Sequence, residues 1–261
     1  MAGGPAAAGG RLRHAEHVMG TVVSFDVPGW AGEPDGLLAE AVRWLHWVDA
    51  TFSPYRDDSD VTRFGNGSLR LSQCAPELAE ILSACAAVSA RSDGYFTTTP
   101  GGRFDPSGYV KGWAIERAAA ILTAAGSASH CVNGGGDVQC TGEREPGQPW
   151  RIGIAHPLRP ASLAVVVTGR DFAVATSGSA ERGPHIANPH TGAPATDLAS
   201  ITVVGATLAE TDAYATAAYA MGAAARDWLE ALEGYEAFAI TPVGSAWQTP
   251  GFPAYVAPSL H

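Results

Sequence analysis

The sequence predicts an α+β fold with mixed or antiparallel sheets and packed helices. Segments with an apolar repeat of helical period and short β-branched runs follow one another, without the regular alternation of βαβ units. No linker divides the 261 residues cleanly, and 46% hydrophobic with 16% charged residues is a globular composition able to bury a substantial core. We therefore expect one folded domain over residues 16–261, after a disordered leader at residues 1–15.

Each element is predicted from its own pattern. Residues 17–27 alternate and are rich in β-branched side chains, which indicates a strand. Residues 35–51 place apolar side chains at helical spacing, and residues 76–92 and 112–125 are predicted to form two more helices. The glycine triplet at 134–136 suits a tight turn or a close backbone approach. The remaining expected elements are strands at 150–155, 162–168, 201–205 and 237–241, a small-residue helix at 211–221 and a further helix from residue 226.

The charge balance limits the kinds of partner. A chain with a net charge of −10 and no basic patch repels nucleic acid and anionic membranes, so an anionic substrate would need a metal ion or helix N-termini beside it. We see no signal peptide and no membrane-spanning segment, so we expect a cytoplasmic protein without membrane insertion. The four cysteines lack CxxC and zinc-finger spacing, and we expect buried or free thiols.

Residues 104–112, FDPSGYVKG, are the first candidate site. Asp105 precedes a proline–serine–glycine turn, and Lys111 then leads into a predicted helix. Unpaired N–H groups at a helix N-terminus suit phosphate oxygens, the lysine adds a positive charge, and exposed turn carbonyls suit a hard cation. An ordinary turn with a solvated lysine explains the same residues.

Two side chains further along the chain form the second candidate site. Asp212 and Thr216 are four residues apart, so on a helix they share one face and both oxygens can meet one metal ion. The alternative is a helix N-cap, in which Thr211 or Asp212 caps the helix and Thr216 bonds back to its own backbone.

The polar segment 174–196 is a candidate site wall between two strand-like runs. It contains Thr176, Ser177 and His185, and the histidine is a candidate general base because its ordinary pKa lies near neutrality. The alternative for each histidine of this segment is a structural or surface side chain. No Gly-x-Ser-x-Gly elbow surrounds Ser177, which argues against a hydrolase triad. The Gly-Gly-Gly-Asp turn at 134–137 is not a dinucleotide-binding Gly-x-Gly-x-x-Gly motif.

Taken in order, these pieces resemble the FAD:protein FMN transferase (ApbE-like) family. The resemblance covers about residues 15–245 and rests on six motifs whose order matches the family. They are M-G-T at 19–21, F-S-x-Y-x-x-x-S at 52–59, D-P-S-x-x-x-K-G-W-A at 105–114, N-x-G-G-D at 133–137, T-S-G at 176–178 with H-I-x-N-P-x-T-G at 185–192, and D-A-x-A-T-A-x-x-x-x-G at 212–222.

The resemblance implies a function and specific roles. Members attach FMN from FAD to a threonine of a target flavoprotein and release AMP, with magnesium. The resemblance implies Mg²⁺ on the Gly108 carbonyl and on the Asp212 and Thr216 side chains, with Asp212 and His185 as catalytic residues and His185 as the base. The candidate FAD-binding residues that it implies are Met19, Tyr55, Tyr95, Asp105, Lys111, Thr176 and Ser177.

Two alternatives remain open, and one departure from the family stands out. Some members hydrolyse FAD to FMN and AMP, and a flavin-binding protein that has lost catalysis would carry much of the same pattern. Thr97 stands where many members have an acid, in Gly94-Tyr95-Phe96-Thr97, and the stretch from there to Asp105 is short.

Overall fold

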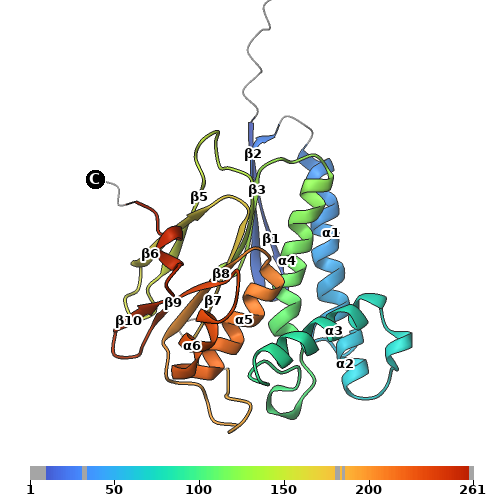
Figure 1. The fold of residues 1–261 in the computed structure, drawn as a ribbon. Coiled ribbons are helices and arrows are strands. Elements are labelled where there is room, and N and C mark those ends of the chain that lie inside the picture. Colours follow the sequence, from blue (N-terminus) through green and yellow to red (C-terminus); the bar gives the residue numbers. More distant parts are fainter. Residues whose placement is uncertain (1–9, 31–33, 180–182, 184–185, 259–261) are drawn as a thin grey trace, which may run out of the picture.

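The computed structural model describes residues 10–30, 34–179, 183 and 186–258. Its centre is an eight-stranded sheet, antiparallel at every pairing, in the order β1-β2-β3-β4-β7-β8-β9-β10 (Figure 1). These strands are β1 (Gly10–Val18), β2 (Thr21–Trp30), β3 (His130–Gly134), β4 (Asp137–Thr141), β7 (Phe172–Gly178), β8 (Ser200–Gly205), β9 (Glu236–Ile240) and β10 (Ala246–Gln248).

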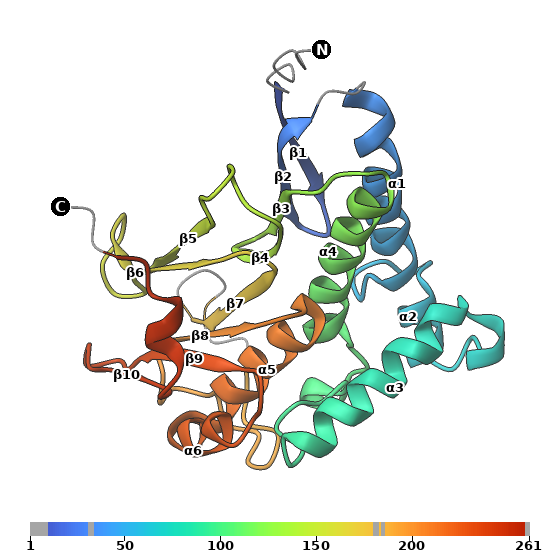
Figure 2. The same cartoon turned by 45° about the horizontal axis from the view of Figure 1, so that its top comes forward.

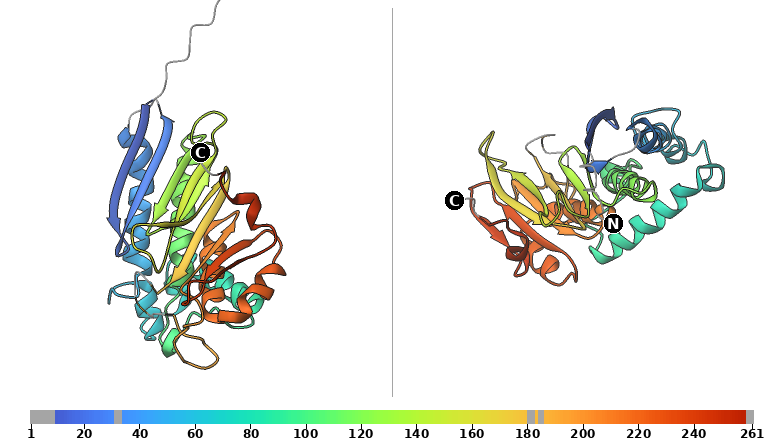
Figure 3. Two further views of the ribbon diagram at one scale, coloured as in Figure 1. Left: turned by 90° about the vertical axis from the view of Figure 1, so that its left-hand side faces the viewer. Right: turned by 90° about the horizontal axis from the view of Figure 1, so that it is seen from above.

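The helices cover one face of this sheet, and a two-stranded ribbon lies against the other (Figures 2 and 3). The α-helices are α1 (Pro34–Phe52), α2 (Asp60–Gly65), α3 (Pro76–Arg91), α4 (Ser107–Ala124), α5 (Leu208–Met221) and α6 (Ala225–Glu230). The ribbon pairs β5 (Trp150–Ala155) with β6 (Leu163–Gly169). The larger core lies on the helical side, and the smaller core lies between the sheet and the ribbon. The α+β prediction with antiparallel sheets is therefore confirmed.

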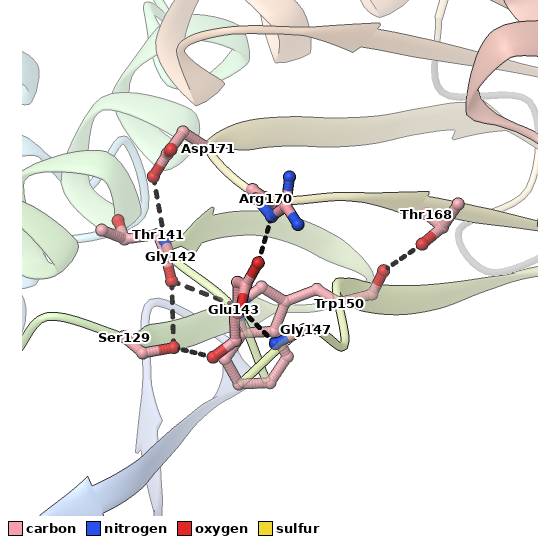
Figure 4. Close-up of polar contacts among 9 residues, drawn as sticks. All are labelled: Ser129, Thr141, Gly142, Glu143, Gly147, Trp150, Thr168, Arg170 and Asp171. Carbon is pink, nitrogen blue, oxygen red and sulfur yellow. Dashed lines mark hydrogen bonds and ion pairs between the residues drawn. The ribbon is translucent and has the colours of Figure 1, made fainter. Parts of the chain in front are cut away.

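Side chains fix the ribbon to the main sheet at the β4–β5 connection (Figure 4). The Gly142 N–H donates to Asp171, 2.8 Å away, and Glu143 pairs with Arg170; both partners lie in the β6–β7 connection. The buried indole of Trp150 donates to a carbonyl at the end of β4, 3.0 Å away. The first two bonds join the β4–β5 connection to the β6–β7 connection, and the third joins β5 to β4. They hold the ribbon beside β4 and β7, although its strands pair only with each other.

The N-terminal strand prediction needs correction. Residues 17–27 belong to a hairpin, in which Val18 pairs with Thr21 across a two-residue turn. Met19 and Gly20 both have positive φ, 55° and 68°, which matches the twist of a tight hairpin. Residues 10–15, which we expected in the disordered leader, belong to β1. Their burial alternates along the chain, as in a strand that packs on one face. Residues 1–9 of the expected leader lie outside the described residues.

Helix α4 begins five residues earlier than predicted. The Pro106 carbonyl accepts the N–H groups of Tyr109 and Val110, and the Asp105 carboxylate accepts the Ser107 N–H. Proline and glycine at residues 106–108 are typical of a turn. The first N–H groups of a helix have no acceptor within it, however, so a proline that lacks an N–H is equally suited to a helix start. The Pro-Ser-Gly segment is therefore the start of the helix itself.

Other predictions are confirmed closely. Helices α1 and α3 begin and end within a residue of their predicted bounds, and the glycine triplet forms the β3–β4 turn. All four cysteines are free thiols, of which Cys85 and Cys140 are buried. Among the described residues, no helix is long and apolar enough to cross a membrane.

Candidate active site

Helices α4 and α5 contact each other at Gly112. A Cβ on this glycine would lie 2.6 Å from the Leu208 carbonyl oxygen and 3.0 Å from the Asp212 Cβ, so only glycine permits the contact. The two helices carry the two halves of the expected site. Their close approach brings segments about a hundred residues apart in the chain to one place.

The three expected metal ligands lie along this contact. A Cβ on Gly108 would lie 3.8 Å from the Thr216 methyl carbon, so the first turn of α4 sits beside Thr216. Asp212 is one helical turn before Thr216 on the same face of α5, and its side chain is 5% exposed. A carbonyl, a carboxylate and a hydroxyl are oxygen donors of the kind that Mg²⁺ binds. These residues therefore fit the ion that the sequence motifs imply.

The position of Gly108 corrects one expectation. Its carbonyl is not in an exposed turn but inside α4, where the helical bond to the N–H of Gly112 uses one lone pair. A carbonyl oxygen has a second lone pair, so a cation can still bind it. Among the described residues, no three His, Cys, Asp or Glu side chains gather closely enough to form a different metal centre.

The capping alternative for Asp212 is wrong. Helix α5 begins at Leu208 with Thr207 as its N-cap, so Asp212 lies in the second turn. Two side chains from other elements accept the first N–H groups instead. Gln139 accepts from Leu208 and Glu116 accepts from Ala209, each at a distance of 2.9 Å. Burial raises the pKa of Glu116, although the bond from Ala209 acts in the opposite direction. The start of α5 is thus fixed by β4 and α4.

Lys111 and two carboxylates form a charged group that we call the ion triad (Lys111, Asp137 and Asp212). The Lys111 ammonium contacts one oxygen of Asp137 and lies 3.6 Å from Asp212 Oδ2. The Asp137 side chain is 2% exposed, and its other oxygen accepts the Thr176 N–H over 2.9 Å. Lys111 itself is 22% exposed, so it is not the solvated lysine of the alternative interpretation.

The T-S-G motif lies on a strand, not in the loop that we expected. Thr176 and Ser177 belong to β7, so their side chains point to opposite faces of the sheet. Ala173 and Ala175 pack in the core on the helical side, which places Ser177 on the helix-facing side and buries it. Thr176 is on the ribbon side, where its hydroxyl lies 2.8 Å from that of Thr202. The two candidates therefore do not line one surface.

The M-G-T and F-S-x-Y motifs contact the β3–β4 turn and the segment that precedes α4. Thr21 lies against the β3–β4 turn, since its hydroxyl is 2.8 Å from where a Cβ on Gly135 would be. Met19, two residues earlier, packs on the helical-side core. Arg103 donates to the Pro54 carbonyl, which brings the F-S-x-Y segment beside the loop that leads to Asp105.

Two tyrosines expected to contact FAD differ in their surroundings. Tyr55 is 88% exposed, so its ring is available to a ligand. Tyr95 meets His190 edge-on, with ring centroids 4.5 Å apart, and so joins the Gly94–Thr97 region to the H-I-x-N-P segment. The Thr97 hydroxyl lies 3.2 Å from that of Thr99. His185 lies outside the described residues.

Comparison with known proteins decides the family. Residues 19–102 and 97–239 match the ApbE family. The chain belongs to this family. An 86-residue segment is 36% identical to a protein of Rhodobacter capsulatus described as an FAD:protein FMN transferase, and this match covers 33% of the chain and 16% of that relative. The chain thus matches about a sixth of the relative's length.

Solved ApbE structures share the fold at low sequence identity. The ApbE protein of Thermotoga maritima superposes with a TM-score of 0.85 at 21% identity, over 95% of this chain and all of that one. The Vibrio cholerae flavin transferase ApbE gives 0.83 at 21% identity, over 94% and 99% of the two chains. The apo Pseudomonas stutzeri flavinyl transferase ApbE gives 0.83 at 22% identity, over 96% and 98%. The chain therefore shares the ApbE fold over nearly all of its length.

Three site residues escaped sequence reasoning. Asp137, Glu116 and Gln139 bind partners that lie 26 to 93 residues away in the chain, and such pairings leave no local pattern. Only Asp137 left a signal, since it ends the N-x-G-G-D motif of the ApbE family.

Proposed function

We propose that the chain is a Mg²⁺-dependent flavin transferase, which moves FMN from FAD to a threonine hydroxyl of a target flavoprotein and releases AMP. The observation that carries this proposal is the alignment of Gly108, Asp212 and Thr216 along the α4–α5 contact of an ApbE fold. Relatives described as flavin transferases support the reaction class.

The reaction exchanges one phosphorus–oxygen bond for another. The acceptor threonine oxygen attacks the phosphorus on the FMN side of the FAD pyrophosphate, and the bond to the AMP oxygen breaks. The threonine proton must pass to a base, for which we propose His185. A bound Mg²⁺ would neutralise the pyrophosphate oxygens, which matters in a chain with a net charge of −10.

The residues proposed for FAD differ in what they offer. The exposed ring of Tyr55 can pack against a planar ligand. Tyr95 and Met19 pack against the helical-side core, and Asp105 accepts the Ser107 N–H at the start of α4. We propose these four as FAD contacts. Ser177 faces the helical side of the sheet and Lys111 lies beside Asp212, so both stay candidates, whereas Thr176 acts through its backbone N–H on Asp137.

Mass spectrometry of an acceptor protein tests the proposal. The chain is incubated with FAD, Mg²⁺ and a flavoprotein that carries a candidate threonine, and with a matched acceptor in which that threonine is valine. A transferase adds FMN to the first acceptor alone and releases AMP. FMN and AMP without any adduct would indicate an FAD pyrophosphatase instead, and unchanged FAD would overturn both enzymatic functions.

A further inference from the structure

Both oxygens of the Asp137 carboxylate already have partners within the protein, so we do not count Asp137 among the metal ligands. Its side chain is 2% exposed, with one oxygen on the Thr176 N–H and the other on the Lys111 ammonium. It begins β4 directly after the glycine turn, and the Asn133 side chain braces that turn by accepting the Gly136 N–H over 3.0 Å. The carboxylate is thus fixed in place, and its effect on the site must pass through what it touches.

Lys111 is the group through which Asp137 reaches the metal site. Its ammonium touches Asp137 but lies 3.6 Å from Asp212 Oδ2, beyond the 2.7–3.2 Å of a direct N–H···O bond. One cation therefore lies between two carboxylates and is bound closely by only one of them. The carboxylate it does not bind closely is the one proposed to bind the metal.

We propose that Asp137 is a positioning residue: it draws the Lys111 ammonium toward itself and so keeps that cation from occupying the Asp212 carboxylate. This inference rests on the metal site proposed above. The charges support it, because two carboxylates and one ammonium leave a net charge of −1 that favours a divalent cation. Without the charge of Asp137, Lys111 and Asp212 become a neutral pair in which the lysine competes directly for the metal ligand.

Asp137→Asn is the sharpest test. Asparagine keeps an oxygen that can accept the Thr176 N–H, but it loses the charge and can turn an NH₂ group toward the ammonium. Lys111 should then move onto Asp212. We expect Mn²⁺ binding to the full chain, measured by calorimetry, to weaken by roughly tenfold or more, because the competing charge now contacts the ligand itself.

A second background separates positioning from a direct effect. In Lys111→Met, no ammonium remains to be positioned. The factor by which Asp137→Asn lowers the Mn²⁺ affinity should therefore be at least three times smaller in this background than in the natural chain, as expected for two coupled residues. Equal losses in both backgrounds would overturn the inference, because Asp137 would then act by its own field or by supporting the fold. Unchanged binding in Asp137→Asn would overturn it as well.

Lys111→Met alone guards against a variant that does not fold. The inference predicts that it binds Mn²⁺ at least as tightly as the natural chain, since the competitor is gone; weaker binding would contradict this. Near-UV circular dichroism checks the fold of each variant. If the natural chain binds no Mn²⁺, with or without FAD, the proposed metal site is wrong, and the inference about Asp137 falls with it. If the natural chain binds Mn²⁺ and only the variants behave otherwise than expected, the inference alone is wrong.

Discussion

Gly112→Ala tests the contact on which the whole site depends. The new methyl carbon would lie 2.6 Å from the Leu208 carbonyl oxygen, whereas ordinary contact begins at 3.4 Å. The helices must therefore separate by about 0.8 Å at a point where both neighbours are backbone or Cβ atoms. Overpacking of this kind costs about 1–3 kcal/mol, of which alanine's better helix propensity offsets roughly 0.5–1 kcal/mol.

The expected result is a net loss in the free energy of unfolding of about 1 kcal/mol, measured by urea denaturation. Because Asp212 lies 3.0 Å from the same methyl position, AMP release from FAD should fall as well. Gly36→Ala is the matched control, since Gly36 is exposed in α1 and a Cβ there meets nothing within 4 Å. The control should be stabilised by roughly 0.5–1 kcal/mol. A Gly112→Ala protein as stable and active as this control would refute the packing argument.

The remaining predictions concern separate parts of the chain. Asp212→Asn should lower the rate of Mg²⁺-dependent AMP release by roughly a hundredfold or more, because the proposed metal would lose its one carboxylate ligand. Chromatography of the released nucleotides measures this rate. Tyr55→Ala should raise the KM for FAD several-fold and leave the urea midpoint unchanged, since the ring is 88% exposed. Burial lowers the pKa of His130 to about 4, below its ordinary 6.5. The unfolded chain therefore takes up a proton before the folded chain does, so His130 contributes stability above pH 6.5 that is lost as the pH falls toward 4. Between pH 7 and pH 5 this amounts to about 2 kcal/mol, and His130→Leu should show a smaller loss of unfolding free energy over that interval.

The sequence predicted what local patterns determine. Helices α1 and α3 have an apolar repeat and clear ends, and Asp212 and Thr216 were placed on one helix face by their spacing alone. The start of α4 was missed because Pro106 and Gly108 are typical of turns as well as of first helical turns. β7 was missed for a similar reason, since its polar end at Thr176 and Ser177 resembles a loop.

Interactions between distant segments could not be predicted in the same way. The direction of Lys111 depends on Asp137, which reaches it from another element, and nothing near Lys111 in the chain indicates that carboxylate. The capping of α5 by Glu116 and Gln139 likewise replaces the side-chain bond that the N-cap residue Thr207 does not make. The six ordered motifs still indicated the family, because a family pattern records such distant contacts without explaining them.

The most direct test of the metal site is an anomalous-diffraction measurement on crystals of the chain grown with Mn²⁺ and FAD. We predict one strong manganese peak at the α4–α5 contact, bound by the Gly108 carbonyl, the Asp212 carboxylate and the Thr216 hydroxyl, and in contact with the FAD pyrophosphate. A manganese peak elsewhere on a flavin-loaded chain, with these three oxygens unbound, would contradict the account.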